Sequence, residues 1–133
     1  MRIVLDTNVW VSAILLPGAT ADLAVLAVLA GKATALVSKP FVAEVIRVLG
    51  RKFSRDREQL ARVAIFLNDI AEPVTPRNRV HELSDEPDDR VLECAVAGRA
   101  DLIVTGDRAT LRLGQCQGIE IISLRALLER LEK

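Results

Sequence analysis

The stretch RIVLD, from Arg2 to Asp6, places three apolar residues directly before an aspartate. The stretch LIVTGD, from Leu102 to Asp107, repeats this arrangement near the other end of the chain. Runs that are apolar at every position are typical of strands covered on both faces, as in a parallel sheet. We therefore expect Ile3–Leu5 and Leu102–Thr105 to be neighbouring central strands of one sheet.

Three weaker runs complete a predicted set of five strands: ATALVS (Ala33–Ser38), AEPVTP (Ala71–Pro76) and IEIIS (Ile119–Ser123). Helical patterns lie between the strands, at Ala21–Ala30, Lys39–Leu49, Asp56–Ile70, Pro87–Ala97 and Leu124–Leu131, three of them closed by Gly31, Gly50 and Gly98. The order β-α-β-α-α-β-α-β-α-β-α requires crossover connections, which favour a mostly parallel sheet with helices on both faces. The sequence predicts one three-layer α/β/α domain over residues 1–133.

The composition indicates a chain that folds around one core. Half of its 133 residues are hydrophobic and its mean hydropathy is +0.27. The longest apolar stretches, such as LAVLAVLA (Leu23–Ala30), fall short of the roughly 20 residues that cross a bilayer. The N-terminus meets Asp6 too early for a signal peptide. We expect a cytoplasmic protein without a membrane partner, in which Cys94 and Cys116 are reduced, buried thiols.

Two acids end the two central runs. Parallel sheets place their functional sites at the carboxyl ends of the strands, so Asp6 and Asp107 are expected at one edge. Asp6 opens DTNVWVS, in which Asn8 and Ser12 add polar oxygens nearby. Taken alone, an aspartate at a strand end is more often a turn residue or a helix cap.

A dense acidic cluster lies in SDEPDDRVLECA, from Ser84 to Ala95. It holds four carboxylates within five consecutive residues, Asp85, Glu86, Asp88 and Asp89. Acids in the first turn of a helix complement the positive end of its dipole, which accounts for one or two of them. Four repel one another unless water or a cation screens them. The excess leaves a metal-binding interpretation open, with Asp85 and Glu86 assigned to capping and to the outer edge of the pocket.

Glu44 stands among apolar neighbours in SKPFVAEVIRVL. A buried carboxylate needs a partner, and a salt bridge to Arg47 or Arg51 at helical spacing is one reading. The other is a metal site. Brought together, Asp6, Glu44, Asp89 and Asp107 would form a set of hard oxygen ligands suited to Mg²⁺ or Mn²⁺. The single histidine, His81, and the two separated cysteines offer no usual nitrogen and sulfur site, so acid-only chemistry indicates metal-assisted phosphoryl transfer.

Positive charge is concentrated in one segment, although lysine plus arginine (18) balances aspartate plus glutamate (18) overall. The basic residues of this segment are Arg47, Arg51, Lys52, Arg55, Arg57 and Arg62. Two readings remain open, a solvated helical face and a patch that contacts phosphates. On the second reading, Arg47, Arg51 and Lys52 are the candidate RNA-binding residues.

Three motifs carry a resemblance to a known family: DTNVWVS, the isolated glutamate of FVAEVIRVL, and DEPDDRVLECAVAGRADLIVTGDRATL. Together they resemble the PIN-domain ribonucleases, in particular the VapC-like toxins of bacterial and archaeal toxin-antitoxin pairs, nearly from end to end. The resemblance implies a PIN-like fold and a Mg²⁺- or Mn²⁺-dependent endoribonuclease. The family's acids fall on Asp6, Glu44, Asp89 and Asp107, with Asp6, Asp89 and Asp107 as metal ligands.

The same resemblance places further polar residues around the site. The family's threonine or serine near the last motif corresponds to Thr105, and its polar residue after the first acid to Asn8. The register of DRVLECAVA favours Asp89 over Asp88, which stays a candidate second ligand. RNA is the implied substrate, and an antitoxin protein and a second copy of the chain are candidate partners.

Competing classes fail on particular residues. A haloacid-dehalogenase-like phosphatase needs a second aspartate two residues after the first, where this chain has Asn8. A receiver domain needs a late lysine, and none lies between Lys52 and Lys133. A catalytically silent PIN-fold protein that binds RNA or another protein remains the alternative from a different class.

Overall fold

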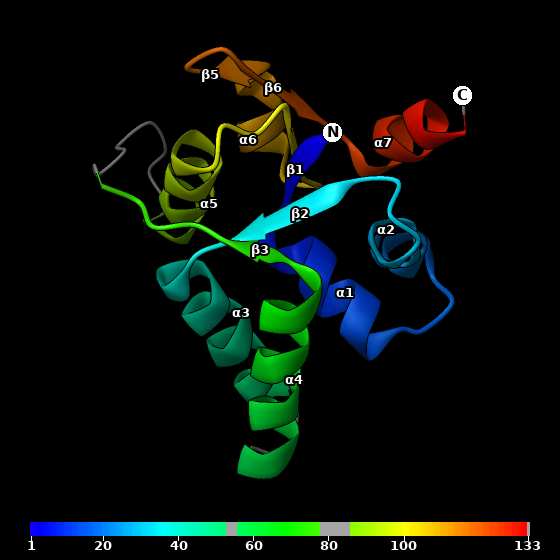
Figure 1. The fold of residues 1–133 in the computed structure, drawn as a ribbon, viewed down its shortest axis with the longest axis vertical. Coiled ribbons are helices and arrows are strands. Elements are labelled where there is room, and N and C mark those ends of the chain that lie inside the picture. The colour runs from blue at the N-terminus through cyan, green and yellow to red at the C-terminus, as the bar shows by residue number, and fades with distance from the viewer. Residues whose placement is uncertain (53–55, 78–85, 133) are drawn as a thin grey trace.

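The computed structural model describes residues 1–52, 56–77 and 86–132, and of residues 86–88 it describes the backbone alone. Its strands form one sheet in the order β3-β2-β1-β4-β6-β5 (Figure 1). Their bounds are β1 Arg2–Leu5, β2 Thr34–Val37, β3 Glu72–Pro73, β4 Leu102–Val104, β5 Gln115–Cys116 and β6 Ile119–Ile122. Every neighbouring pair is parallel except β5 and β6. The predicted mostly parallel sheet is confirmed.

β1 and β4 are neighbours in the middle of this sheet, as their apolar sequences predict. Ile3 pairs with Leu102 and Leu5 with Val104, and all four side chains are buried. The predicted number of strands was wrong, because the described residues contain six rather than five. β5 was missed because its two residues, Gln115 and Cys116, are too short for an alternating or continuous apolar pattern.

Helices cover both faces of the sheet. Their bounds are α1 Thr7–Leu15, α2 Thr20–Leu29, α3 Lys39–Lys52, α4 Arg57–Ile70, α5 Glu86–Ala97, α6 Arg108–Leu113 and α7 Leu124–Leu131. Figure 1 shows α1, α3 and α4 on one side of the sheet and α5 on the other. α7 packs against α2. These layers confirm the predicted α/β/α architecture.

Two helices lie outside the predicted helical ranges. α1 is apolar on most sides and buries Val9, Trp10 and Val11, so its sequence shows little of the one-sided periodicity that marks a helix. α6 is only six residues long and begins at the cap Asp107. α3 also runs through Gly50, where the sequence predicts its end, to Lys52.

Gly98 follows α5 for a steric reason. A Cβ at this position would lie 2.6 Å from Leu36 Cδ1 and 3.0 Å from Val74 Cγ1. The end of α5 therefore approaches β2 more closely than any other residue would allow, which anchors the helix on the sheet. Within the described ranges, no single helix is long and apolar enough to cross a membrane, and α1 and α2, which together have that length and composition, meet at 97°.

Candidate active site

Asp6 is fixed at the carboxyl end of β1. Its backbone N–H donates to Val104 O at 2.9 Å, so it continues the pairing with β4. Its side chain caps α1, because Oδ1 accepts a hydrogen bond from Val9 N at 2.9 Å. Only 6% of Asp6 is exposed. Asp6 is therefore a helix cap, the more common role that we expected for a single aspartate at a strand end. In this position its carboxylate is buried at the carboxyl end of β1.

Thr105 joins this aspartate to the end of β4. The buried Thr105 hydroxyl donates to Asp6 Oδ2, and Thr105 Oγ1 accepts from Asp107 N at 3.0 Å. Asp107 caps α6 in turn, because its Oδ2 accepts from both Thr110 N at 2.9 Å and Thr110 Oγ1 at 2.8 Å. One threonine therefore holds the two strand-end aspartates in a fixed relation.

The environment shifts the two carboxyl pKa values in opposite directions. Burial raises the pKa of Asp6 above its ordinary value, and the negative charge of Asp107 adds to this effect, while the hydrogen bonds from Thr105, Val9 and Gly106 oppose it. The pKa of Asp107 is lowered, chiefly by the hydrogen bonds from the Thr110 amide and hydroxyl. The charge of Asp107 thus works against ionisation of Asp6, and a cation at this edge would relieve that repulsion.

Glu44 is held differently, on α3. Arg47 Nε donates to Glu44 Oε2 at 3.0 Å and Arg47 Nη2 donates to Glu44 Oε1 at 2.6 Å. The Glu44 side chain is 13% exposed and that of Arg47 is 50% exposed. We considered two roles for Glu44, a salt bridge and a metal ligand. The structure shows the salt bridge to Arg47, and the role at a metal stays a prediction.

The acidic cluster is described only in part. Asp89 is 3% exposed in the first turns of α5, and α5 packs against α3, β1 and β4. The side chains of Glu86 and Asp88, together with Asp85 and His81, lie outside the described residues. The choice between Asp88 and Asp89 as a metal ligand stays a prediction.

The structure thus brings Asp6, Thr105 and Asp107 into one hydrogen-bonded group, which we call the β1–β4 edge. Among the residues it describes, no three histidine, cysteine, aspartate or glutamate side chains lie close enough together to hold a metal ion. Asn8 is exposed on the first turn of α1, and Ser12 is half-buried one turn later. Of the four acids that we predicted to lie together, this hydrogen-bonded group contains Asp6 and Asp107, which Thr105 connects. Glu44 and Asp89 are not part of it.

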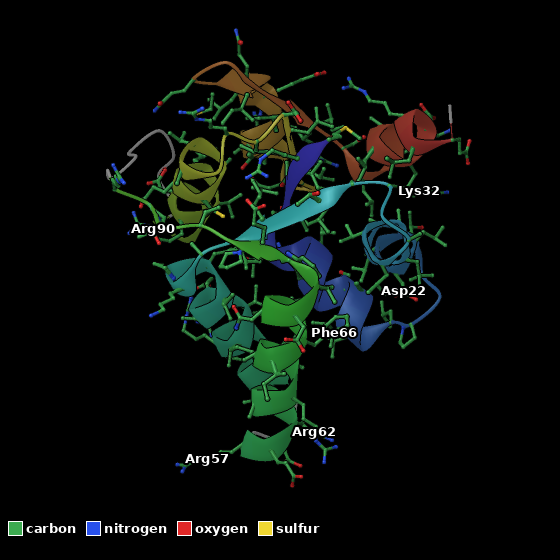
Figure 2. All side chains as sticks on the ribbon, viewed as in Figure 1. Asp22, Lys32, Arg57, Arg62, Phe66 and Arg90 are labelled. Atoms are coloured by element: carbon green, nitrogen blue, oxygen red, sulfur yellow. The ribbon has the colours of Figure 1, made fainter. Side chains whose placement is uncertain are left out.

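The predicted RNA-binding residues follow α3 away from the sheet. Arg51 and Lys52 are exposed in the last turn of this helix. Arg57 and Arg62 lie at the end of α4 that is remote from the sheet (Figure 2), and Arg62 pairs with Glu58 at 2.7 Å. Arg55 lies outside the described residues. Arg51 and Lys52 therefore lie about two helical turns beyond Glu44 on α3, whereas Arg47 lies one turn beyond it.

Sequence reasoning missed two features near the site. Thr110 holds Asp107 through two hydrogen bonds, and the spacing of three residues between a capping aspartate and a hydroxyl was the available signal. Arg90 and Glu93 form a largely buried ion pair at 2.9 Å on α5. Their i,i+3 spacing is common on solvated helices, so it gave no indication of burial.

A pocket of about 310 Å³ lies beside this ion pair. It is lined by Ser38 and Thr75, which follow β2 and β3, and by Arg77, Arg90 and Glu93. A larger pocket of about 1030 Å³ includes Arg2 and Gly98, which lie toward the opposite edge of the sheet from Asp6. Neither Asp6 nor Asp107 lines either pocket.

A mainly parallel sheet with paired aspartates at the carboxyl ends of adjacent central strands defines the class of this protein as an α/β protein with an acidic strand-end site. A family model for the PIN domain matches residues 2–109. The chain therefore belongs to the PIN-domain family.

Comparison with solved structures agrees on the fold. A chain in the crystal structure of VapBC2 from Rickettsia felis, bound to a DNA fragment from their promoter, matches with a TM-score of 0.65 and 19% sequence identity. The match covers 92% of this chain and 98% of that chain. Among curated proteins, none matches this chain in sequence.

Proposed function

We propose that this protein is a Mg²⁺- or Mn²⁺-dependent endoribonuclease that hydrolyses RNA phosphodiester bonds. The observation that supports the proposal most is the β1–β4 edge, where Thr105 holds Asp6 and Asp107 together at the ends of adjacent strands. Membership of the PIN-domain family supports the same activity. The fold alone would not, because one fold hosts many functions.

The donor set of the edge fits a hard cation. Mg²⁺ in proteins is commonly held by one or two carboxylates while it keeps several waters. Asp6 and Asp107 supply two carboxylates. In this structure Asp89 is not grouped with them closely enough to hold a metal ion, and we propose that it becomes a third ligand when the cation binds. We propose Glu44 as a further catalytic carboxylate. A divalent cation would supply positive charge for the phosphodiester and for its leaving oxygen.

The protein's own residues would then position the substrate and the carboxylates. Thr105 fixes Asp6 through its hydroxyl, and the amide and the hydroxyl of Thr110 both donate to Oδ2 of Asp107. Asn8 and Ser12 on α1, and Asp88 on α5, are proposed to contact substrate or to support the ligands. Arg47, Arg51 and Lys52 are proposed to contact RNA phosphates along α3.

We further propose that the protein acts in the cytoplasm as the toxin of a toxin-antitoxin pair. This rests on the similarity in fold to a chain of VapBC2, which is described as a complex bound to promoter DNA. A separate antitoxin protein is therefore one proposed partner, and a second copy of the chain is another. The competing function is a silent PIN-fold binding module, which is favoured by the pairing of Glu44 with Arg47.

The experiment that tests the nuclease is a cleavage assay on a panel of structured and single-stranded RNAs. We expect cleavage with Mg²⁺ or Mn²⁺, reversible loss in EDTA, and loss in Asp6→Asn and Asp107→Asn. Both variants keep the size of the side chain but remove its charge. Asp69→Asn makes the same chemical change at an exposed position on α4, so it should cleave like wild type.

The outcomes separate the two functions. Cleavage that persists in EDTA or in a folded Asp6→Asn protein contradicts the proposed mechanism. RNA that binds to wild type, with no cleavage across the panel in either metal, favours the silent module.

The RNA contacts have their own test. Replacement of Arg51 and Lys52 by alanine should weaken RNA binding and reduce the slope of log affinity against log salt, because each lost phosphate contact removes about one released counterion. Binding measured with the cleavage-deficient Asp6→Asn protein keeps the RNA intact. An unchanged slope would assign these residues to a solvated face.

A further inference from the structure

Glu93 on α5 is a buried acid with one carboxylate oxygen that has no donor. Only 5% of the residue is exposed. Its Oε1 lies 2.9 Å from Arg90 Nε. Its Oε2 is buried and, within the part of the chain that the structure describes, accepts no hydrogen bond. Buried polar atoms normally have a partner, because burial without one costs free energy. A ligand that donates a hydrogen bond to this oxygen would remove that cost.

The acid lines the pocket of about 310 Å³, which we call the Glu93 pocket. This volume is at the small end of the range for ligand pockets, roughly 300–1,000 Å³. The other lining residues provide two proline rings, two hydroxyls and two guanidinium groups: Pro40, Pro76, Ser38, Thr75, Arg77 and Arg90. Unstacked RNA bases are held by flat side-chain faces, including guanidinium planes, and are identified by hydrogen bonds to their edges. The pocket offers both kinds of contact.

The position of this pocket in the fold is next to the β1–β4 edge. β1 and β2 are parallel neighbours, with Ile3 opposite Ala35. Continued by three residues to the ends of the two strands, this register places Ser38 opposite Asp6. Neighbouring strands lie about 4.8 Å apart. The β2 side of the pocket is therefore about one strand spacing from Asp6.

α5 makes the same connection on the other side of the pocket. Glu93 follows Asp89 by four residues, which is one helical turn or about 6 Å along the axis. Side chains at this spacing lie on the same face of a helix. Both residues are buried, with 3% of Asp89 and 5% of Glu93 exposed. A base that flanks a phosphate at the β1–β4 edge is therefore within reach of the pocket.

The hydrogen-bonding groups of the pocket match guanine better than the other bases. Guanine presents two adjacent donors on its Watson–Crick edge, N1–H and the N2 amino group, and a carboxylate such as that of Glu93 accepts from both. Adenine and cytosine present a ring acceptor beside their amino group, which a carboxylate repels, and uracil presents one donor between two acceptors. Arginines, here Arg77 and Arg90, are the usual donors to guanine O6 and N7.

We propose that the Glu93 pocket binds a guanine base of the RNA, and that Glu93 is the residue that selects it. The inference rests on the proposed nuclease function, because it assigns the pocket to the RNA bound at the β1–β4 edge. Glu93 accepts hydrogen bonds from N1–H and the N2 amino group, Arg77 donates to O6, and the base lies against the rings of Pro40 and Pro76. The two arginines disfavour a cationic peptide side chain as the occupant.

The first test measures binding of the four nucleoside 5′-monophosphates in EDTA by calorimetry, so that no metal takes part. We expect GMP to bind about tenfold or more tightly than AMP, CMP and UMP. Glu93→Gln keeps the size of the side chain but replaces one acceptor oxygen by a donor, so it should lose this preference. Glu129→Gln, at a position on α7 whose side chain is 66% exposed, makes the same change as a control and should keep it.

An exposed residue of the pocket supplies a variant that does not endanger the fold. Arg77→Ala should weaken GMP binding, because it removes the donor to O6, while Arg57→Ala at the remote end of α4 should leave it unchanged (Figure 2). Thermal melts should show every variant folded.

The second test sequences the ends that the protein produces from a randomised RNA in Mn²⁺. Wild type should cut at sites that share guanine at one fixed position, and Glu93→Gln should lose that pattern. The two tests separate this inference from the nuclease function. Cleavage without any guanine preference contradicts the role of the pocket and leaves the nuclease. Selective GMP binding without cleavage of any RNA contradicts the nuclease and leaves the pocket.

Three binding results would overturn the proposal. One is equal affinity for the four nucleotides, or a preference for a base other than guanine. Another is a preference for GMP that a folded Glu93→Gln protein retains. The third is tighter binding of N-acetylarginine amide than of GMP, which would assign the pocket to an arginine of a peptide partner.

Discussion

The β1–β4 edge and α3 hold their carboxylates by different means. At the edge, backbone amides and threonine hydroxyls donate to Asp6 and Asp107. On α3, the guanidinium of Arg47 donates to both oxygens of Glu44. Neutral donors fix a carboxylate without cancelling its charge, whereas an arginine cancels it. Asp6 and Asp107 therefore still repel each other, and a cation bound at the edge would relieve this repulsion. Glu44 already has a cationic partner in Arg47.

Metal-induced stabilisation should show the largest difference between the two regions. Ligand that binds only the folded state stabilises it by about 2.7 kcal/mol at a concentration 100 times its dissociation constant. We expect saturating Mn²⁺ to raise the melting temperature of wild type by several degrees, and to raise that of Asp6→Asn or Asp107→Asn much less. Calorimetry with and without Mn²⁺ measures these shifts.

The Mn²⁺-induced shift in melting temperature should also be measured for Glu44→Gln. Because Glu44 is paired with Arg47, its loss should reduce the Mn²⁺ shift less than the loss of Asp6 does. Asp69→Asn on α4 is the control for the chemical change. Equal Mn²⁺ shifts in wild type and Asp6→Asn would sink the proposed metal site at the edge.

Thr105 should carry the next largest effect. Thr105→Val removes the donor to the buried Asp6 Oδ2 and the acceptor for Asp107 N. A buried polar group left without its partner costs about 1–3 kcal/mol, so the free energy of unfolding should fall by that amount. Urea unfolding measures it. Thr34→Val, at the exposed first position of β2, should change it by less than about 0.5 kcal/mol, and a similar small effect at Thr105 would show that the threonine is not structurally required.

Sequence reasoning found the strands that form the edge because Ile3–Leu5 and Leu102–Val104 are apolar at every position, which is a strong local signal. It also placed Asp6 and Asp107 together through the rule for parallel strand ends. It did not find the link through Thr105 Oγ1 to Asp107 N, because hydrogen bonds between side chains and backbone depend on the register of β1 on β4. The three leucines of α2, which are exposed, were likewise read only as an apolar run, since a sequence does not state which side of a wholly apolar helix faces the core.

Within the edge, Asp6 and Asp107 should affect stability in opposite directions in metal-free protein. The folded-state pKa of Asp6 lies above its ordinary value of about 3.9, so ionised Asp6 destabilises the fold at neutral pH, and this cost disappears as pH falls through the raised pKa. The folded-state pKa of Asp107 is lowered, so its stabilisation is present at neutral pH and is lost as pH falls through that lower value.

In EDTA at pH 7 we therefore expect Asp6→Asn to raise the free energy of unfolding and Asp107→Asn to lower it slightly, because Asp107 is only partly buried. Both differences should shrink toward about pH 3, where the unfolded carboxyls protonate. Urea unfolding at several pH values measures them. A loss of stability in Asp6→Asn that is independent of pH would mean that the hydrogen bonds of Asp6 outweigh its burial.

The smallest effect should come from the ion pair on α3. A double-mutant cycle with Glu44→Gln and Arg47→Gln should give a coupling of about 0.3–0.5 kcal/mol, since half of the Arg47 side chain is exposed. The pair Glu58 and Arg62 on α4 is the matched control, at 2.7 Å and with both side chains about three-quarters exposed. If Glu44 also acts at the metal, Mn²⁺ should reduce the coupling of Glu44 with Arg47 and leave that of Glu58 with Arg62 unchanged. A coupling that Mn²⁺ does not alter would confine Glu44 to its salt bridge and restrict the candidate site to the carboxylates of the edge and α5.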